Sequence, residues 1–157
     1  MVTSTKPAPV ELAREIVSRV VDPEIPVVTI ADLGILRDVR LEEDKVVVTI
    51  TPTYSGCPAM TQIADDIRAA VGEHGLGEAE VRLAQHPAWS SDLVTIEGRR
   101  KLREFGIAPP APPEEVLCPR CDSGAPMVLA GFGSTACKAL MVCSSCSEPF
   151  DLFKLYR

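Results

Sequence analysis

The chain has 157 residues, 46% of them hydrophobic and 4% aromatic, which is enough for one ordinary domain or a small domain with an appended module. Its formal net charge of −6 argues against a protein that binds nucleic acid by neutralising phosphates. No apolar run approaches the roughly 20 residues that span a bilayer. Because the N-terminal segment also lacks the apolar block of a signal peptide, we expect a cytoplasmic protein whose thiols stay reduced.

Residues 1–9 are expected to form a flexible tail, and three later segments carry the marks of helices. Pro23 ends the first helix, Pro58 suits the first position of the second, and Gly106 stops the third, for which Ser90 or Ser91 is the expected N-cap. Apolar spacing places these helices at about 10–21, 58–74 and 92–105.

Two stretches with alternating apolar and polar residues predict strands. An acidic turn at 42–44 divides the first stretch, 34–53, into a β-hairpin, and 78–85 forms one more strand. The expected fold is therefore α/β, a small sandwich of about three strands and covering helices over residues 10–107. The proline-rich segment 108–116 is expected to be a linker to a second module at 117–157.

The second module has too few apolar residues for a core of its own, and its cysteines explain how it folds. Two Cys-x-x-Cys pairs can place four thiolates around one ion, and three short strands surround them, which predicts a small β zinc ribbon. A rubredoxin-like iron site uses similar spacing, whereas two disulfides do not suit a reducing compartment. The expected structural zinc ligands are Cys118, Cys121, Cys143 and Cys146.

Cys57 and Cys137 remain outside those pairs. Cys57, in "SGCP", lies at or next to a predicted helix N-terminus, where free amides and the helix dipole lower a thiol pKa. The alternative is a buried core residue. Asp22 and Glu24 either cap the turn in "DPEIP" or line the same site as Cys57. Cys137 is a core residue, an alternate ligand or a redox group.

Seven motifs carry a resemblance to known families. "DPEIP", "DLGILRDV", "TPTYSGCPAM" and "GRRKLREFGIAPP" together resemble the SufT-like iron–sulfur-assembly domain family. The segments "CPRC", "FGSTACKAL" and "EPFDLFK" resemble the ribbon of one branch, the D-type accessory subunits of phenylacetyl-CoA ring epoxidase.

The resemblance implies an accessory protein of aerobic phenylacetate degradation, without a substrate reaction of its own. It would help to assemble or repair an iron–sulfur or di-iron centre of the multicomponent monooxygenase. Its expected partners are the oxygenase or reductase subunits, and it is expected to bind neither nucleic acid nor a membrane. Cys57 would bind iron or a cluster transiently. Because four thiolates normally hold a cluster, a second copy in a homodimer, a client or a small thiol would complete the ligands. A purely structural bridging subunit, a rubredoxin-like redox protein and a general iron–sulfur carrier are the alternatives.

Overall fold

The computed structural model describes residues 9–157, and the predicted tail lies outside the described residues except for Pro9, which begins α1 (Pro9–Ser18). The first sheet has the order β1-β2-β3. β1 (Leu36–Glu42) and β2 (Lys45–Ile50) form the predicted hairpin, and β3 (Ala79–Leu83) runs parallel to β2. The α/β prediction is confirmed.

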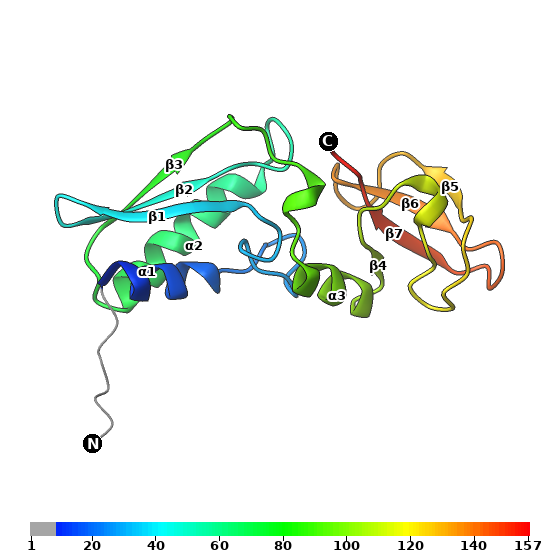
Figure 1. Cartoon of the computed structure of the whole chain (residues 1–157), viewed down its shortest axis with the longest axis horizontal. Helices are drawn as coiled ribbons and strands as arrows, with labels where there is room; N and C mark the ends of the chain where they lie inside the picture. Colours follow the sequence, from blue (N-terminus) through cyan, green and yellow to red (C-terminus); the bar gives the residue numbers. More distant parts are fainter. Residues whose placement is uncertain (1–8) are drawn as a thin grey trace, which may run out of the picture.

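Two helices cover one face of the first sheet. α2 (Ala59–Glu73) connects β2 to β3, as a parallel pair of strands requires, and it packs beside α1 (Figure 1). The apolar stripes of both helices join alternate residues of β2 in one core: Ala13, Val17, Val46, Val48, Ile50, Ile63, Ile67 and Val71. The other face of the sheet carries ion pairs of Glu42 and Glu80 with arginines. The period-2 pattern of β2 therefore determines which residues enter this core, while Val47, on the other face, is buried outside it.

The second sheet has four strands in the order β4-β7-β6-β5. Three of them were predicted: β5 (Met127–Ala130), β6 (Lys138–Val142) and β7 (Pro149–Phe153). The fourth, β4 (Ile107–Ala108), has two residues, too few for a sequence pattern, and pairs in parallel with β7. A 3₁₀ turn, η2 (Pro113–Glu115), lies between β4 and β5.

The third helix begins later than predicted. α3 (Ile96–Glu104) starts after Thr95, whose Oγ1 accepts a hydrogen bond from the Gly98 amide at 3.0 Å. Ser91 belongs instead to a separate 3₁₀ turn, η1 (Ser91–Leu93). The predicted start at 92 and the serine cap are therefore wrong, whereas Gly106, with φ of 90°, ends the helix as expected.

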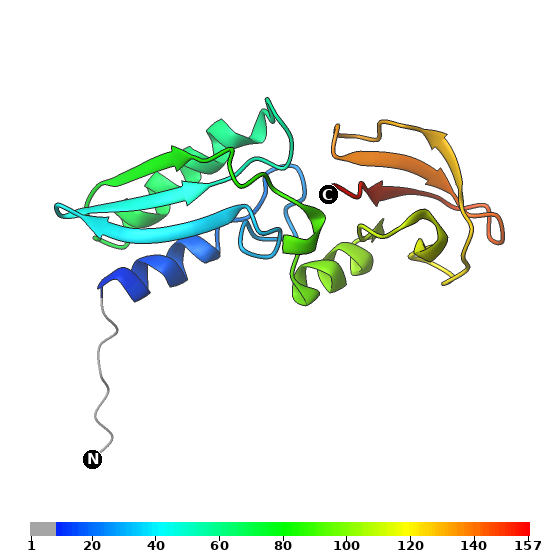
Figure 2. The ribbon, with the colours of Figure 1, turned by 45° about the horizontal axis from the view of Figure 1, so that its top comes forward.

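The hydrophobic core of the first sheet extends to Cys137 and Phe153 of the second module, and Figure 2 shows α3 and the segment before it between the two sheets. The ribbon also has a small core cluster of its own, contrary to the expectation from its composition, with Val116, Met141 and Phe150 among its members. The Trp89 indole N–H donates to the Leu33 carbonyl at 2.7 Å, and its ring lies 5.9 Å from those of Phe153 and Tyr156. Ser91 fastens the same segment, because its amide donates to the Tyr156 carbonyl at 2.9 Å and its hydroxyl accepts from the Tyr156 amide at 2.6 Å. The second sheet thus completes the core of the first.

Among residues 9–157, no helix combines the length and the hydrophobicity needed to cross a membrane.

Candidate functional site

The second sheet holds four cysteine sulfurs together, as the sequence predicted. All four lie within 4.8 Å of one another, and two of the separations are 3.8 Å, between Cys118 and Cys146, and 3.5 Å, between Cys121 and Cys143. A tetrahedral site with metal–sulfur bonds of about 2.3 Å has sulfurs about 3.8 Å apart. The four thiols therefore fit one tetrahedral metal ion and leave no protein position open for a substrate.

The two Cys-x-x-Cys turns repeat the same backbone. Cys118 and Cys143 each accept a hydrogen bond at their carbonyl from the residue four positions later, Asp122 and Ser147, at 3.0 Å. Both of these residues adopt a φ of 62°, an uncommon conformation for a residue with a side chain. The amides of residues 145 and 146 also point at the Cys143 sulfur, 3.4 and 3.5 Å away. Such amides stabilise a thiolate, which is the ligand form.

Cys57 lies in a tight turn before α2. The Cys57 amide donates to the Tyr54 carbonyl at 3.3 Å, and Gly56, the third residue of the turn, has φ of 78°. This is the glycine position of a type II turn, since a side chain there would be strained. Pro58 is the N-cap of α2, so Cys57 lies one residue before the cap. The sequence prediction of its place is confirmed.

A small, partly open cavity brings Cys57 together with the acidic residues of "DPEIP". The cavity has a volume of ≈ 10 Å³, and Asp22, Glu24, Thr53, Cys57 and Cys137 provide its polar lining. Cys137 arrives from the second sheet, immediately before β6, and only 4% of it is exposed. The structure thus places the two unpaired cysteines and both carboxylates around one cavity.

The environment of the cavity disfavours negative charge, contrary to the lowered thiol pKa expected for Cys57. Burial raises the pKa of Cys57, outweighing hydrogen bonds from the Ala59 amide and the Tyr54 hydroxyl, and Glu24 and Asp22 raise it further. Burial likewise raises the pKa values of Asp22, Glu24 and Cys137. The expectation was wrong because desolvation exceeds the effect of the helix N-terminus, and the uncharged thiol is therefore favoured.

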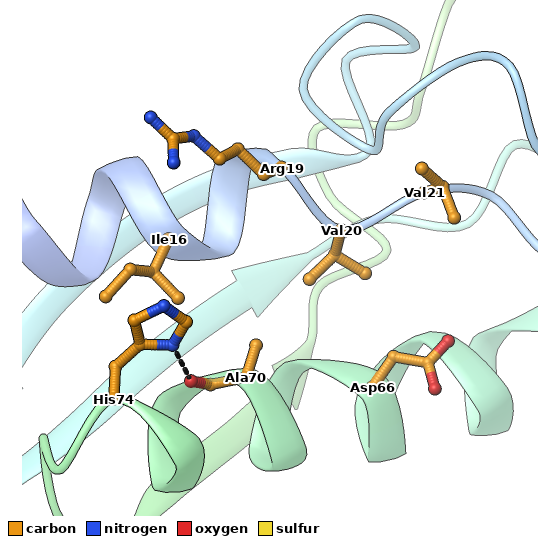
Figure 3. A pocket seen from close by; sticks show the side chains of 7 residues that line it. All are labelled: Ile16, Arg19, Val20, Val21, Asp66, Ala70 and His74. Atoms are coloured by element: carbon orange, nitrogen blue, oxygen red, sulfur yellow. Dashed lines mark hydrogen bonds between the residues drawn. The ribbon is translucent and has the colours of Figure 1, made fainter.

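A separate groove between α1 and α2, with a volume of ≈ 380 Å³, offers no comparable chemistry (Figure 3). Its lining is mainly aliphatic. Nδ1 of His74 is hydrogen-bonded to the Ala70 carbonyl at 2.7 Å, and Asp66 accepts a hydrogen bond from Gln62 at 2.7 Å. The chemically reactive groups of the described chain concentrate in the cysteine ribbon and in the Cys57 cavity.

The fold and these sites define a class: an iron–sulfur assembly domain followed by a four-cysteine ribbon. The family model described as "Iron-sulfur cluster assembly protein" matches residues 13–83, and that described as "PaaD zinc beta ribbon domain" matches residues 107–154. A domain of unknown function, DUF59, from Bacillus anthracis has a similar structure, with a TM-score of 0.55 and 29% identity, over 60% of this chain and 91% of that one.

Sequence relatives narrow the class to one family. An Escherichia coli (strain K12) protein, named as the D-type subunit of a "Putative 1,2-phenylacetyl-CoA epoxidase", is 48% identical over 146 residues, 88% of either chain. The "Fe-S protein maturation auxiliary factor YitW" of Bacillus subtilis (strain 168) is 35% identical over 79 residues, 49% of this chain and 76% of the relative. The chain belongs to the family of D-type phenylacetyl-CoA epoxidase subunits.

One polar lining residue of the cavity, Cys137, was not predicted to lie beside Cys57. The sequence left three alternative roles open for Cys137. The signal that separates it from the ribbon ligands is its position outside both Cys-x-x-Cys pairs. Tyr54, whose hydroxyl interacts with Cys57, belongs to the same turn and does not line the cavity. The contact of Cys137 with this cavity depends on how the two sheets pack, which no local pattern contains.

Proposed function

We propose that this chain is an accessory subunit that helps to mature a metal centre of phenylacetyl-CoA epoxidase, and that Cys57 binds the iron or cluster during transfer. The observation that carries the proposal is the placement of Cys57 beside Asp22 and Glu24 in a cavity of an iron–sulfur assembly domain. Thiolate and carboxylate are both iron ligands.

Zinc is the proposed ion of the ribbon. Four thiols at tetrahedral separations with no open position suit a structural Zn²⁺, and the match to a zinc ribbon family supports that ion over iron. When bound, the ion links the two Cys-x-x-Cys turns. Elemental analysis of purified protein is expected to give one zinc per chain, and a coloured protein with one iron would contradict the assignment.

The ribbon is also the proposed docking surface for an oxygenase or reductase subunit of the epoxidase. β5 is an edge strand, paired only with β6 within the described chain, and its residues are all exposed. Met127, Val128, Leu129 and Phe132 on and after this strand are 55–72% exposed. Apolar surface on an unpaired edge is typical of a protein contact. Leu129→Asp is expected to reduce co-purification with the epoxidase subunits, whereas Leu41→Asp, on the other sheet, should not.

The maturation role is tested by co-expressing the epoxidase subunits with wild-type chain, Cys57→Ser or no accessory chain. Ser55→Ala, an exposed change in the same turn, is the matched control. Cys57→Ser is expected to fold and keep its ribbon metal, while the purified epoxidase contains less iron and has lower activity. Full iron content and activity with Cys57→Ser would refute the maturation role.

The exposed β5 edge favours a second candidate, a purely structural subunit that bridges oxygenase and reductase. That function predicts stable stoichiometric co-purification with active epoxidase and no effect of Cys57→Ser. A third candidate function is a general carrier of iron–sulfur clusters, which the resemblance of the first domain to iron–sulfur maturation factors supports. In that case Cys57→Ser would impair other iron–sulfur proteins in the same cells to the same extent.

A further inference from the structure

β3 lies at one edge of the first sheet, so one side of this strand is not paired with another strand (Figure 1). On the side that faces β2, the Val46 amide donates to the Glu78 carbonyl at 3.0 Å and the Ala84 amide donates to the Ile50 carbonyl at 2.9 Å. In a parallel pair, successive residues direct their backbone groups to opposite sides of the strand. The amides and carbonyls that point away from the sheet are therefore those of Ala79, Val81 and Leu83.

The opposite edge of the same sheet, β1, is protected against pairing with a further strand, whereas β3 is not. The Arg14 guanidinium donates to the Val39 carbonyl of β1 at 2.9 Å, and an irregularity between Leu36 and Asp38 interrupts the register of β1. β3 keeps a regular register with β2 along its whole length and contains no proline. A regular, unpaired edge is a template for another strand.

The edge of β3 has one apolar and one charged face. On the face that carries α2, Leu83 is 60% exposed and lines a groove of ≈ 210 Å³ between β3 and the helix. Thr61 and Ala64 are small residues on the helix side of this groove, which leaves room for a neighbouring strand. On the opposite face, the side chains of Glu80 and Arg82 are 46% and 41% exposed.

The sequence of β3 is complementary to itself when two copies run antiparallel. In a pair centred on Val81, Glu80 of each copy lies opposite Arg82 of the other, and Ala79 lies opposite Leu83. Opposite charges across two strands stabilise the pair, and like charges destabilise it. A pair centred on Glu80 or on Arg82 would place two like charges opposite each other. The charges therefore select the register centred on Val81, in which the outward backbone groups of both copies also meet.

We propose that β3 is a dimer interface, in which two copies of this chain pair antiparallel about a two-fold axis at Val81. The two sheets then form one continuous sheet in the order β1-β2-β3-β3-β2-β1. A second copy is the occupant because the charge pattern of β3 matches its own reverse. Such a two-fold contact closes after two copies, and the outer edges of the joined sheet are the protected β1 strands. The inference goes beyond the proposed function and does not depend on Cys57.

The test measures the mass of the full chain, loaded with one equivalent of zinc, by sedimentation equilibrium at concentrations up to about 1 mM. The wild-type mass is expected to rise with concentration from 16.9 kDa toward twice that value. Arg82→Glu and Glu80→Arg each place like charges across the interface and should weaken self-association at least about tenfold. Arg40→Glu, a charge reversal on β1, is the matched control and should associate as the wild type does.

A mixture of the two β3 variants tests the register itself. When Glu80→Arg pairs with Arg82→Glu, both cross-strand positions again hold opposite charges, so the mixture should dimerise with about the wild-type affinity. Sedimentation of fluorescently labelled Glu80→Arg measures this association. Arg40→Glu carries the same net charge as Arg82→Glu, and it should bind the labelled chain more weakly. This comparison separates register-specific pairing from general attraction between oppositely changed chains.

Zinc content and far-UV circular dichroism verify that each variant is folded. A monomeric wild type at every concentration, unchanged self-association of both β3 variants, or no recovery in their mixture would overturn the dimer interface. A monomeric wild type whose Arg82→Glu form no longer co-purifies with the epoxidase subunits would assign the edge to a client strand instead. None of these results alters the maturation role, which Cys57→Ser tests separately.

Discussion

Phe153→Ala tests whether the second sheet completes the core of the first. Phe153 is 1% exposed, its ring lies 5.9 Å from Trp89, and it lines the Cys57 cavity. Truncating a buried phenylalanine costs about 3–5 kcal/mol. At about 2–4 °C per kcal/mol for a chain of this size, the melting temperature should fall by about 6–20 °C.

The assay is thermal unfolding of the zinc-loaded protein, followed by circular dichroism. Phe132→Ala is the matched control, because Phe132 is 72% exposed and its ring contacts the Lys154 ammonium at 4.1 Å. Its removal should cost about 1 kcal/mol or less. A single shifted transition is expected for Phe153→Ala. Two separate transitions, of which only one shifts, would refute the shared core.

Three further predictions concern the metal, the buried acid and the indole. Chelating the ribbon metal should lower the melting temperature of the whole described fold, and one equivalent of Zn²⁺ should restore it. Asp22→Asn should stabilise the zinc-loaded protein at pH 7 in urea unfolding. Burial raises the pKa of Asp22, so its ionised carboxylate destabilises the fold at pH values above the pKa of the folded state. Below the pKa of the unfolded state the carboxyl is protonated in both states, and the stability gained by Asp22→Asn should therefore vanish as the pH falls below about 4. A gain that grows at low pH would contradict this prediction. Trp89→Phe leaves the Leu33 carbonyl without its donor and should lower the free energy of unfolding in urea by about 1–3 kcal/mol. An unchanged free energy of unfolding would show that water replaces the indole and would contradict the prediction.

Most of the fold could be predicted because its elements carry local patterns. Val46, Val48 and Ile50 alternate along β2, and the apolar stripe of α2 has helical spacing between a proline and a glycine. The four ribbon cysteines were equally predictable, because their spacing alone brings them together around an ion.

The failures have a common physical origin in contacts between distant segments. Ser91 does not cap α3 because its hydroxyl accepts from the amide of Tyr156, 65 residues later. The helix instead starts after Thr95. The pKa of Cys57 is raised, not lowered, because packing between the sheets removes water from its surroundings. Neither effect can be inferred from the residues adjacent in sequence.

The contribution of β7 to the core has a consequence for the order in which the protein is built. β7 follows every element of the first sheet in the chain, yet Phe153 closes the space over Trp89 and beside Cys57. During synthesis the Trp89 face and the Cys57 thiol therefore stay open to solvent until β7 has left the ribosome and paired with β6. Because the four clustered cysteines join the turns on either side of these strands, the proposed Cys57 site is complete only in chains whose ribbon has already folded.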